Sequence, residues 1–72
     1  MKLYVEVYFS ASGSDPLKII KSLKDLGFEP VIGKYDFAQE YNNPEEYRKI
    51  VEGLMRALRG TETRYRLITR KE

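Results

Sequence analysis

Histidine and cysteine, the side chains that most often carry acid–base and nucleophilic chemistry, are both absent from this chain of 72 residues. Their absence excludes Ser–His–Asp and Cys–His catalytic systems, disulfides and nearly all zinc or copper sites. Four acids lie near one another in sequence (Asp36, Glu40, Glu45 and Glu46), but surface and helix-capping roles explain them without a metal ion. We therefore predict a protein that is not an enzyme and holds neither a metal nor a cofactor.

Tyrosine and arginine are the residue types here that indicate binding. Tyr4 and Tyr8 alternate with Glu6, and residues 56–72 carry six basic side chains, five of them arginine, against two acids. Tyrosine and arginine are both enriched in protein interfaces. The net charge of +2 is too small to imply a polyanionic partner.

Four strands must position these side chains. Alternating hydropathy predicts them at residues 2–9, 28–32, 35–41 and 61–70. Pro30 has no amide hydrogen to donate, which assigns the second strand to a sheet edge. In the third strand the opposite register would bury two acids, so we place the aromatic residues inward. The residues predicted to face the core are Leu3, Val5, Val7 and Phe9, then Tyr35, Phe37, Gln39 and Tyr41, and finally Thr63, Tyr65, Leu67 and Thr69.

The segment SASGSDP, residues 10–16, links the first strand to the first helix. A serine- and glycine-rich turn before a helix could cradle an anion. We favour a strand-to-helix turn, because Asp15 places a negative charge at the positive end of the helix dipole. Ser14 or Asp15 is the expected N-cap, Pro16 occupies the first turn and Gly27 ends the helix. The apolar stripe of this helix is Ile19, Ile20, Leu23 and Leu26.

The second helix has clear start and stop signals. Asn43 is the expected N-cap, Pro44 follows at the first helical position, and Glu46 is placed to close a capping box. Gly60 ends the helix, and Gly53 within it is expected to permit the close approach of a neighbouring element. The buried stripe is Tyr47, Ile50, Val51, Leu54 and Leu58.

The order strand, helix, strand, strand, helix, strand predicts a single ferredoxin-like α+β domain over residues 1–72. Right-handed crossovers place both helices on one face of an antiparallel sheet with strand order 4-1-3-2. A core this small is marginally stable, and without disulfides the remaining means of stabilising it is oligomerisation. No signal peptide or membrane span is recognised, so we expect a cytoplasmic protein.

The sheet face away from the helices mixes aromatic, apolar and charged side chains, and Glu6 is placed to pair with Arg64 or Arg66. Self-association through this face and a solvated polar surface both explain the mixture. The alternative is a nucleic-acid-binding module using Tyr4, Tyr8 and the C-terminal arginines, although Asp36 and Glu40 would repel a phosphate backbone. The predicted self-association face comprises Tyr4, Glu6, Tyr8, Ala38, Arg64, Arg66 and Ile68.

Two short motifs resemble a known family. Residues 33–37, Gly-Lys-Tyr-Asp-Phe, and residues 59–63, Arg-Gly-Thr-Glu-Thr, are similar to turns in the ligand-sensing domain of Lrp/AsnC-type regulators. Residues 26–30 are also similar to small archaeal thiamine-binding-type proteins. The Lrp/AsnC resemblance implies a dimer or a larger homo-oligomer with a small-molecule effector, such as an amino acid, between subunits. It assigns Gly33 and Asp36 to the ligand-binding region.

Overall fold

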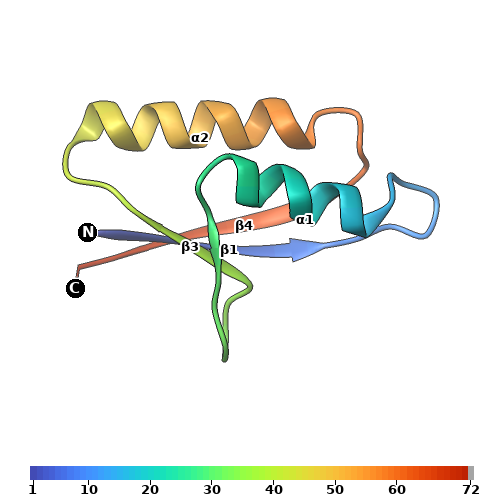
Figure 1. Cartoon of the computed structure of the whole chain (residues 1–72), viewed down its shortest axis with the longest axis horizontal. Coiled ribbons are helices and arrows are strands. Elements are labelled where there is room, and N and C mark those ends of the chain that lie inside the picture. Colours follow the sequence, from blue (N-terminus) through green and yellow to red (C-terminus); the bar gives the residue numbers. More distant parts are fainter. Residues whose placement is uncertain (72) are drawn as a thin grey trace.

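The computed structural model describes residues 1–71 and has two layers, a four-stranded sheet and two helices that cover one side of it (Figure 1). The sheet is antiparallel with the order β2-β3-β1-β4. This is the predicted ferredoxin-like fold with the predicted strand order. The elements are β1 (Lys2–Tyr8), α1 (Pro16–Asp25), β2 (Glu29–Pro30), β3 (Phe37–Glu40), α2 (Pro44–Leu58) and β4 (Arg64–Arg70).

The core lies between the sheet and the helices. Leu3 and Val5 of β1 are fully buried, as are Leu23 of α1 and Leu54 of α2. Alternate residues of a strand point to opposite faces, so this burial leaves Tyr4 and Glu6 on the side without helices. The core cluster comprises Leu3, Val5, Ile19, Leu23, Phe28, Phe37, Tyr41, Leu54 and Leu58.

The two helices approach each other closely where the chain leaves α1. A Cβ atom at Gly53 would lie 3.2 Å from Cδ2 of Leu26, closer than side chains usually pack. The prediction that Gly53 admits a neighbouring element is therefore confirmed, and the neighbour is the end of α1.

The predicted N-caps are confirmed, with one correction. Asp15 accepts a hydrogen bond from the Leu17 amide, and Asn43 Oδ1 accepts one from the Glu46 amide at 2.9 Å. The Glu46 carboxylate accepts from the Asn42 amide at 2.8 Å, one residue before the N-cap, rather than from Asn43 itself. The second hydrogen bond of the capping box is therefore made with Asn42, the residue before the N-cap.

All four strands are shorter than predicted, and three residues predicted to lie in the core are not buried there. Phe9 follows the last residue of β1 and is 41% exposed. Thr69 is exposed at the far end of β4, where it lines a shallow depression beside Tyr47. Tyr35 lies outside β3, because regular pairing ends at Phe37 and the chain then turns into a hairpin. None of the helices in residues 1–71 has the length and apolar character needed to cross a membrane.

Candidate interaction face

The uncovered side of the sheet, called the outer face below, is organised around β1. Tyr4 lies opposite Ala38 of β3 and opposite Ile68 of β4, while Glu6 lies opposite Arg66 and Tyr8 opposite Arg64. Residues directly opposite in an antiparallel pair share a face. The register therefore places the seven residues predicted for self-association side by side: Tyr4, Glu6, Tyr8, Ala38, Arg64, Arg66 and Ile68.

The centre of the outer face is aromatic. The rings of Tyr4 and Tyr35 lie 4.8 Å apart between centroids, tilted by 35°. Arg70 donates a hydrogen bond of 2.9 Å to the Tyr35 hydroxyl, and its guanidinium lies 5.6 Å from the ring centroid. Ala38 beneath this group is only 2% exposed, so it is less accessible than the prediction of an open face implied. Sequence periodicity placed Tyr35 in the core and so missed it here.

Glu6 is a partly buried charge of the outer face. Its side chain is 17% exposed, and Arg66 Nη1 lies 3.6 Å from Glu6 Oε1, which confirms a cross-strand ion pair with Arg66. Tyr8 donates to Glu6 Oε2 at 3.0 Å. This hydrogen bond raises the pKa of Tyr8, because ionising the phenol would remove the donor and place two negative charges together.

The strands on the two sides of the outer face carry opposite charge. On β4 the exposed residues Arg64, Arg66 and Arg70 alternate along one side. On the β2–β3 side, Glu29 and Glu40 are exposed and no basic residue occurs in either strand. The tyrosines of β1 separate the two sides. The face is therefore polarised across the strands rather than along them.

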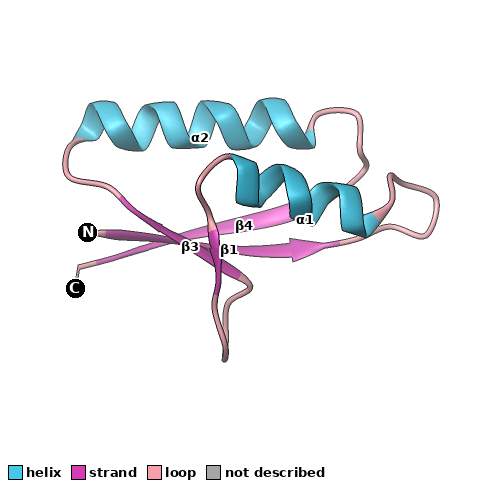
Figure 2. Ribbon diagram, viewed as in Figure 1, coloured by secondary structure: helices cyan, strands magenta, loops and turns pink. Residues whose placement is uncertain are grey.

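The hairpin between β2 and β3, residues 31–36, extends past the sheet on the side away from the helices (Figure 2). Ile32 at its tip is completely exposed. Gly33 next to it has φ of +119°, which favours glycine, and no atom lies within 4 Å of where its Cβ would be. Asp36 at the base accepts from the Val7 amide at 2.9 Å through Oδ2. Of the two predicted ligand residues, Gly33 thus shapes the tip and Asp36 ties the hairpin to β1.

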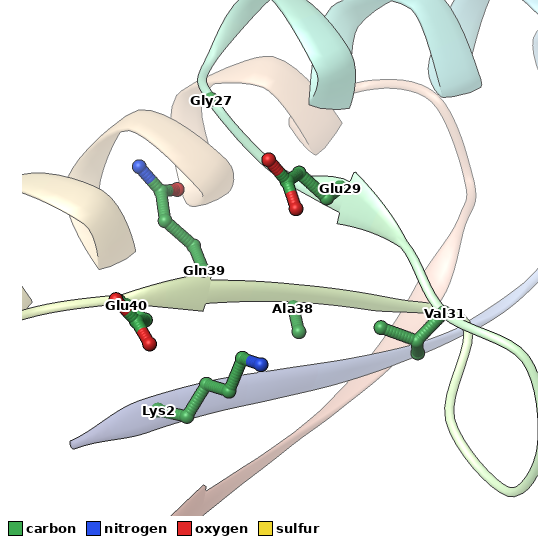
Figure 3. Close-up of a pocket in the computed structure, with 7 residues that line it drawn as sticks. All are labelled: Lys2, Gly27, Glu29, Val31, Ala38, Gln39 and Glu40. Carbon is green, nitrogen blue, oxygen red and sulfur yellow. The ribbon is translucent and has the colours of Figure 1, made fainter.

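A cavity of about 310 Å³ lies beside the hairpin at the β2–β3 side of the sheet. Figure 3 shows charged side chains around it, with Lys2 on one side and Glu29 and Glu40 on the others. Val31 and Ala38 contribute apolar surface, and the Gln39 amide donates to the Leu26 carbonyl at 3.3 Å. Neither Gly33 nor Asp36 lines this cavity. Sequence reasoning missed it because its lining comes from three strands and a loop.

The polar groups of SASGSDP are used within the protein. The Ser14 amide donates to the Thr61 carbonyl at 3.1 Å, and Ser12 Oγ donates to Glu62 at 3.0 Å. Gly13 lies so close to the carbonyl of Thr61 that a Cβ would be 2.4 Å from that oxygen. With Asp15 capping α1, the strand-to-helix interpretation is favoured over an anion site.

Comparisons with family models, with curated proteins and with solved structures gave no significant match. Within residues 1–71, no three acidic side chains lie together in a way that could hold a metal ion. The outer face and the cavity beside it are the candidate functional features of the described residues.

Proposed function

We propose that this chain is a non-enzymatic domain that forms a homodimer through the outer face and binds a small molecule at the edge of that interface. The observation that carries the proposal is the aromatic centre of Tyr4 and Tyr35 with Ile68 beside it, on the side that the helices leave uncovered. Tyrosine and arginine around a partly apolar centre are typical of protein interfaces.

The size of the domain supports the same proposal. A standard interface removes about 800 Å² from each partner, which is roughly 15% of the 5283 Å² accessible surface of this chain. One complete face of a two-layer domain is of that order. Burial of this face would add apolar stabilisation to a core that is small for an independent domain.

The cavity beside Lys2 supports the small-molecule part of the proposal. One cationic and two carboxylate side chains converge on it with an apolar floor, a set that suits a small zwitterion such as an amino acid. Four of its lining residues, Lys2, Glu29, Ala38 and Glu40, belong to the sheet face that a stacked second copy would cover. A ligand there would bind between subunits, as the resemblance to Lrp/AsnC-type domains implies.

Nucleic-acid binding is the second candidate, and the geometry favours it less. Tyr4 is already packed against Tyr35, and the hydroxyl of Tyr8 is bonded to Glu6. Arg66 and Arg70 both contact side chains of the same chain. A base would have to displace these contacts, and a phosphate backbone would meet the carboxylate of Glu6.

Light scattering after size exclusion tests the homodimer directly. We expect a mass near twice 8.5 kDa at micromolar concentrations, and a dimer that weakens when Tyr4 is replaced by serine. A Lys21→Ser variant, changed on the exposed side of α1, is the control and should dimerise normally. A chain that stays monomeric up to about 1 mM would refute the homodimer.

Thermal unfolding with added L-amino acids tests the small-molecule site. A bound ligand raises the melting temperature by mass action, and Lys2→Met should remove that shift. Lys24→Met, at an exposed position of α1, is the matched control. Salt-sensitive retention of RNA by the wild-type chain, lost in Arg64→Ala and Arg66→Ala together, would favour the nucleic-acid alternative.

A further inference from the structure

The charge polarity of the outer face restricts how a second copy can lie on it. Lys2 of β1 has Glu40 of β3 on one side and Arg70 of β4 on the other, all in one row across the sheet. Arg64 and Arg66 extend the basic side along β4, and Glu29 of β2 extends the acidic side. The division into a basic and an acidic side therefore persists along the length of the strands.

Two faces can stack with two-fold symmetry in two simple ways. An axis that crosses the strands places β4 of one copy over β4 of the other, which brings six arginines together. An axis parallel to β1 places β4 over β3 and β2 of the other copy, where Glu29 and Glu40 lie. Stacked sheets are about 10 Å apart, so long arginine and glutamate side chains can meet across the interface. Only the second arrangement places the arginines of β4 over carboxylates.

The hairpin supports the same arrangement. It rises from the β2–β3 side and extends past the outer face, as Figure 1 shows, with Ile32 exposed at its tip. With the axis parallel to β1, the β4 edge of the second copy lies beside this hairpin. A completely exposed isoleucine would then gain an apolar contact, and each copy would hold the edge of the other.

We infer that two copies of this chain stack with their two-fold axis parallel to β1, so that Arg70 of each copy faces Glu40 of the other and each hairpin tip lies along the partner's β4 edge. This inference rests on the proposed homodimer and specifies its geometry. It also brings the basic strand of the second copy over Glu29 and Glu40, two of the residues that line the cavity beside Lys2.

A charge exchange tests the orientation. Arg70→Glu and Glu40→Arg should each weaken the dimer roughly tenfold, since symmetry repeats the pair twice, and the double variant should recover to within about threefold of wild type. The matched control exchanges Arg48 and Glu52 on the exposed side of α2, and should leave the dissociation constant of the dimer unchanged. Sedimentation equilibrium measures the dissociation constant of the dimer for each variant.

The outcomes separate this inference from the homodimer itself. If the wild-type chain dimerises but the double variant dimerises no more tightly than the single variants, the orientation alone is overturned. Single variants that tighten the dimer would indicate the crossed axis, with β4 over β4, and also overturn it. A wild-type chain that is monomeric in every experiment overturns both the dimer and its orientation.

The hairpin contact has its own test. Ile32→Asp should weaken the dimer about tenfold or more, because a carboxylate would replace an apolar side chain that the proposed dimer buries. Leu17→Asp, at a position 74% exposed on α1, introduces the same charge far from the outer face and should have no effect. Equal dimer constants for Ile32→Asp and wild type would refute the hairpin contact. Because Ile32 is completely exposed, the variant is expected to fold normally, and circular dichroism checks this.

Discussion

The two faces of the sheet come from the same strands but are stabilised in different ways. In β1, Leu3 and Val5 point toward the helices and are fully buried, while Tyr4 between them and Glu6 after them point outward and remain partly exposed. The inner face is held by apolar burial, whereas the outer face is held by an aromatic pair, an ion pair and hydrogen bonds. The inner face therefore carries most of the stability of the fold, and the outer face is the side that we propose binds a second copy.

The energetic scales of the two faces explain this division. Burial of a complete leucine side chain contributes about 1.5–3 kcal/mol, whereas an exposed ion pair contributes about 0–1 kcal/mol. Substitutions on the outer face should therefore alter association with little effect on folding. Four measurements test that division, and the largest expected effect is described first.

Leu54→Ala should be the most destabilising of these substitutions. Leu54 is fully buried in α2, so truncation leaves a cavity and costs about 2–5 kcal/mol, enough to unfold a small domain. Ile68→Ala on the outer face removes a similar volume and should cost less than about 1 kcal/mol. Urea unfolding, at protein concentrations below the dissociation constant of the dimer, measures the free energy of unfolding of both variants. Equal losses for the two variants would contradict the division between the faces.

Asp36→Ala should have an intermediate effect. The carboxylate accepts the Val7 amide hydrogen and joins the hairpin to β1, so its removal should lower the free energy of unfolding by about 1 kcal/mol. Asp36→Asn keeps an acceptor oxygen and should retain most of that stability. Asp25→Ala, an exposed acid at the end of α1, controls for the change in charge. The same loss in Asp25→Ala would remove the specific role assigned to Asp36.

The pair of Glu6 and Arg66 should contribute little to folding. The Arg66 side chain is 66% exposed and the atoms lie 3.6 Å apart, so a double-mutant cycle should give a coupling of about 0.2–0.5 kcal/mol. The coupling should shrink further in 0.5 M salt, because exposed pairs are screened at about that concentration. A coupling well above 1 kcal/mol would mean that the outer face stabilises the monomer after all.

The smallest effect is the titration of Tyr8. Its pKa lies above the usual value for tyrosine because the phenol donates to Glu6. Glu6→Gln should therefore lower the Tyr8 pKa toward that usual value, as followed by NMR of the tyrosine rings. Because the folded-state pKa is raised, the associated stabilisation is present below the unfolded pKa and disappears as pH rises through the folded pKa. An unchanged Tyr8 pKa in the Glu6→Gln variant would show that the hydrogen bond to Glu6 is not what raises it.

Much of the outer face could be predicted because strand alternation is a local property. Tyr4, Glu6 and Tyr8 had to share a face once β1 was recognised, and the fold order then placed β4 beside them. Tyr35 could not be placed in this way, because its position depends on where the pairing of β3 ends. The regular alternation of residues 35–41 gave no sign that the chain would leave the sheet before Phe37.

The cavity beside Lys2 shows the same limit. Its lining is drawn from β1, β3, the segment around β2 and the turn after α1, and no sequence motif marks these positions. The motif at residues 33–37 pointed instead to Gly33 and Asp36, which the structure uses for the tip and the anchor of the hairpin. A turn motif reports backbone conformation, and the same conformation can serve different ligands or none.

The order of the elements, the helix N-caps, the strand order and the exclusion of His- and Cys-based chemistry follow from composition, local periodicity and chain connectivity, so the sequence alone was enough to predict them. The packing of Tyr35 on Tyr4, the hydrogen bond from the Val7 amide to Asp36 and the division of charge across the outer face became visible only in the folded chain. These contacts join residues that are far apart in the sequence. Asp36 lies 29 residues from Val7, and Arg70 lies 35 from Tyr35, so these contacts exist only after folding brings their strands together.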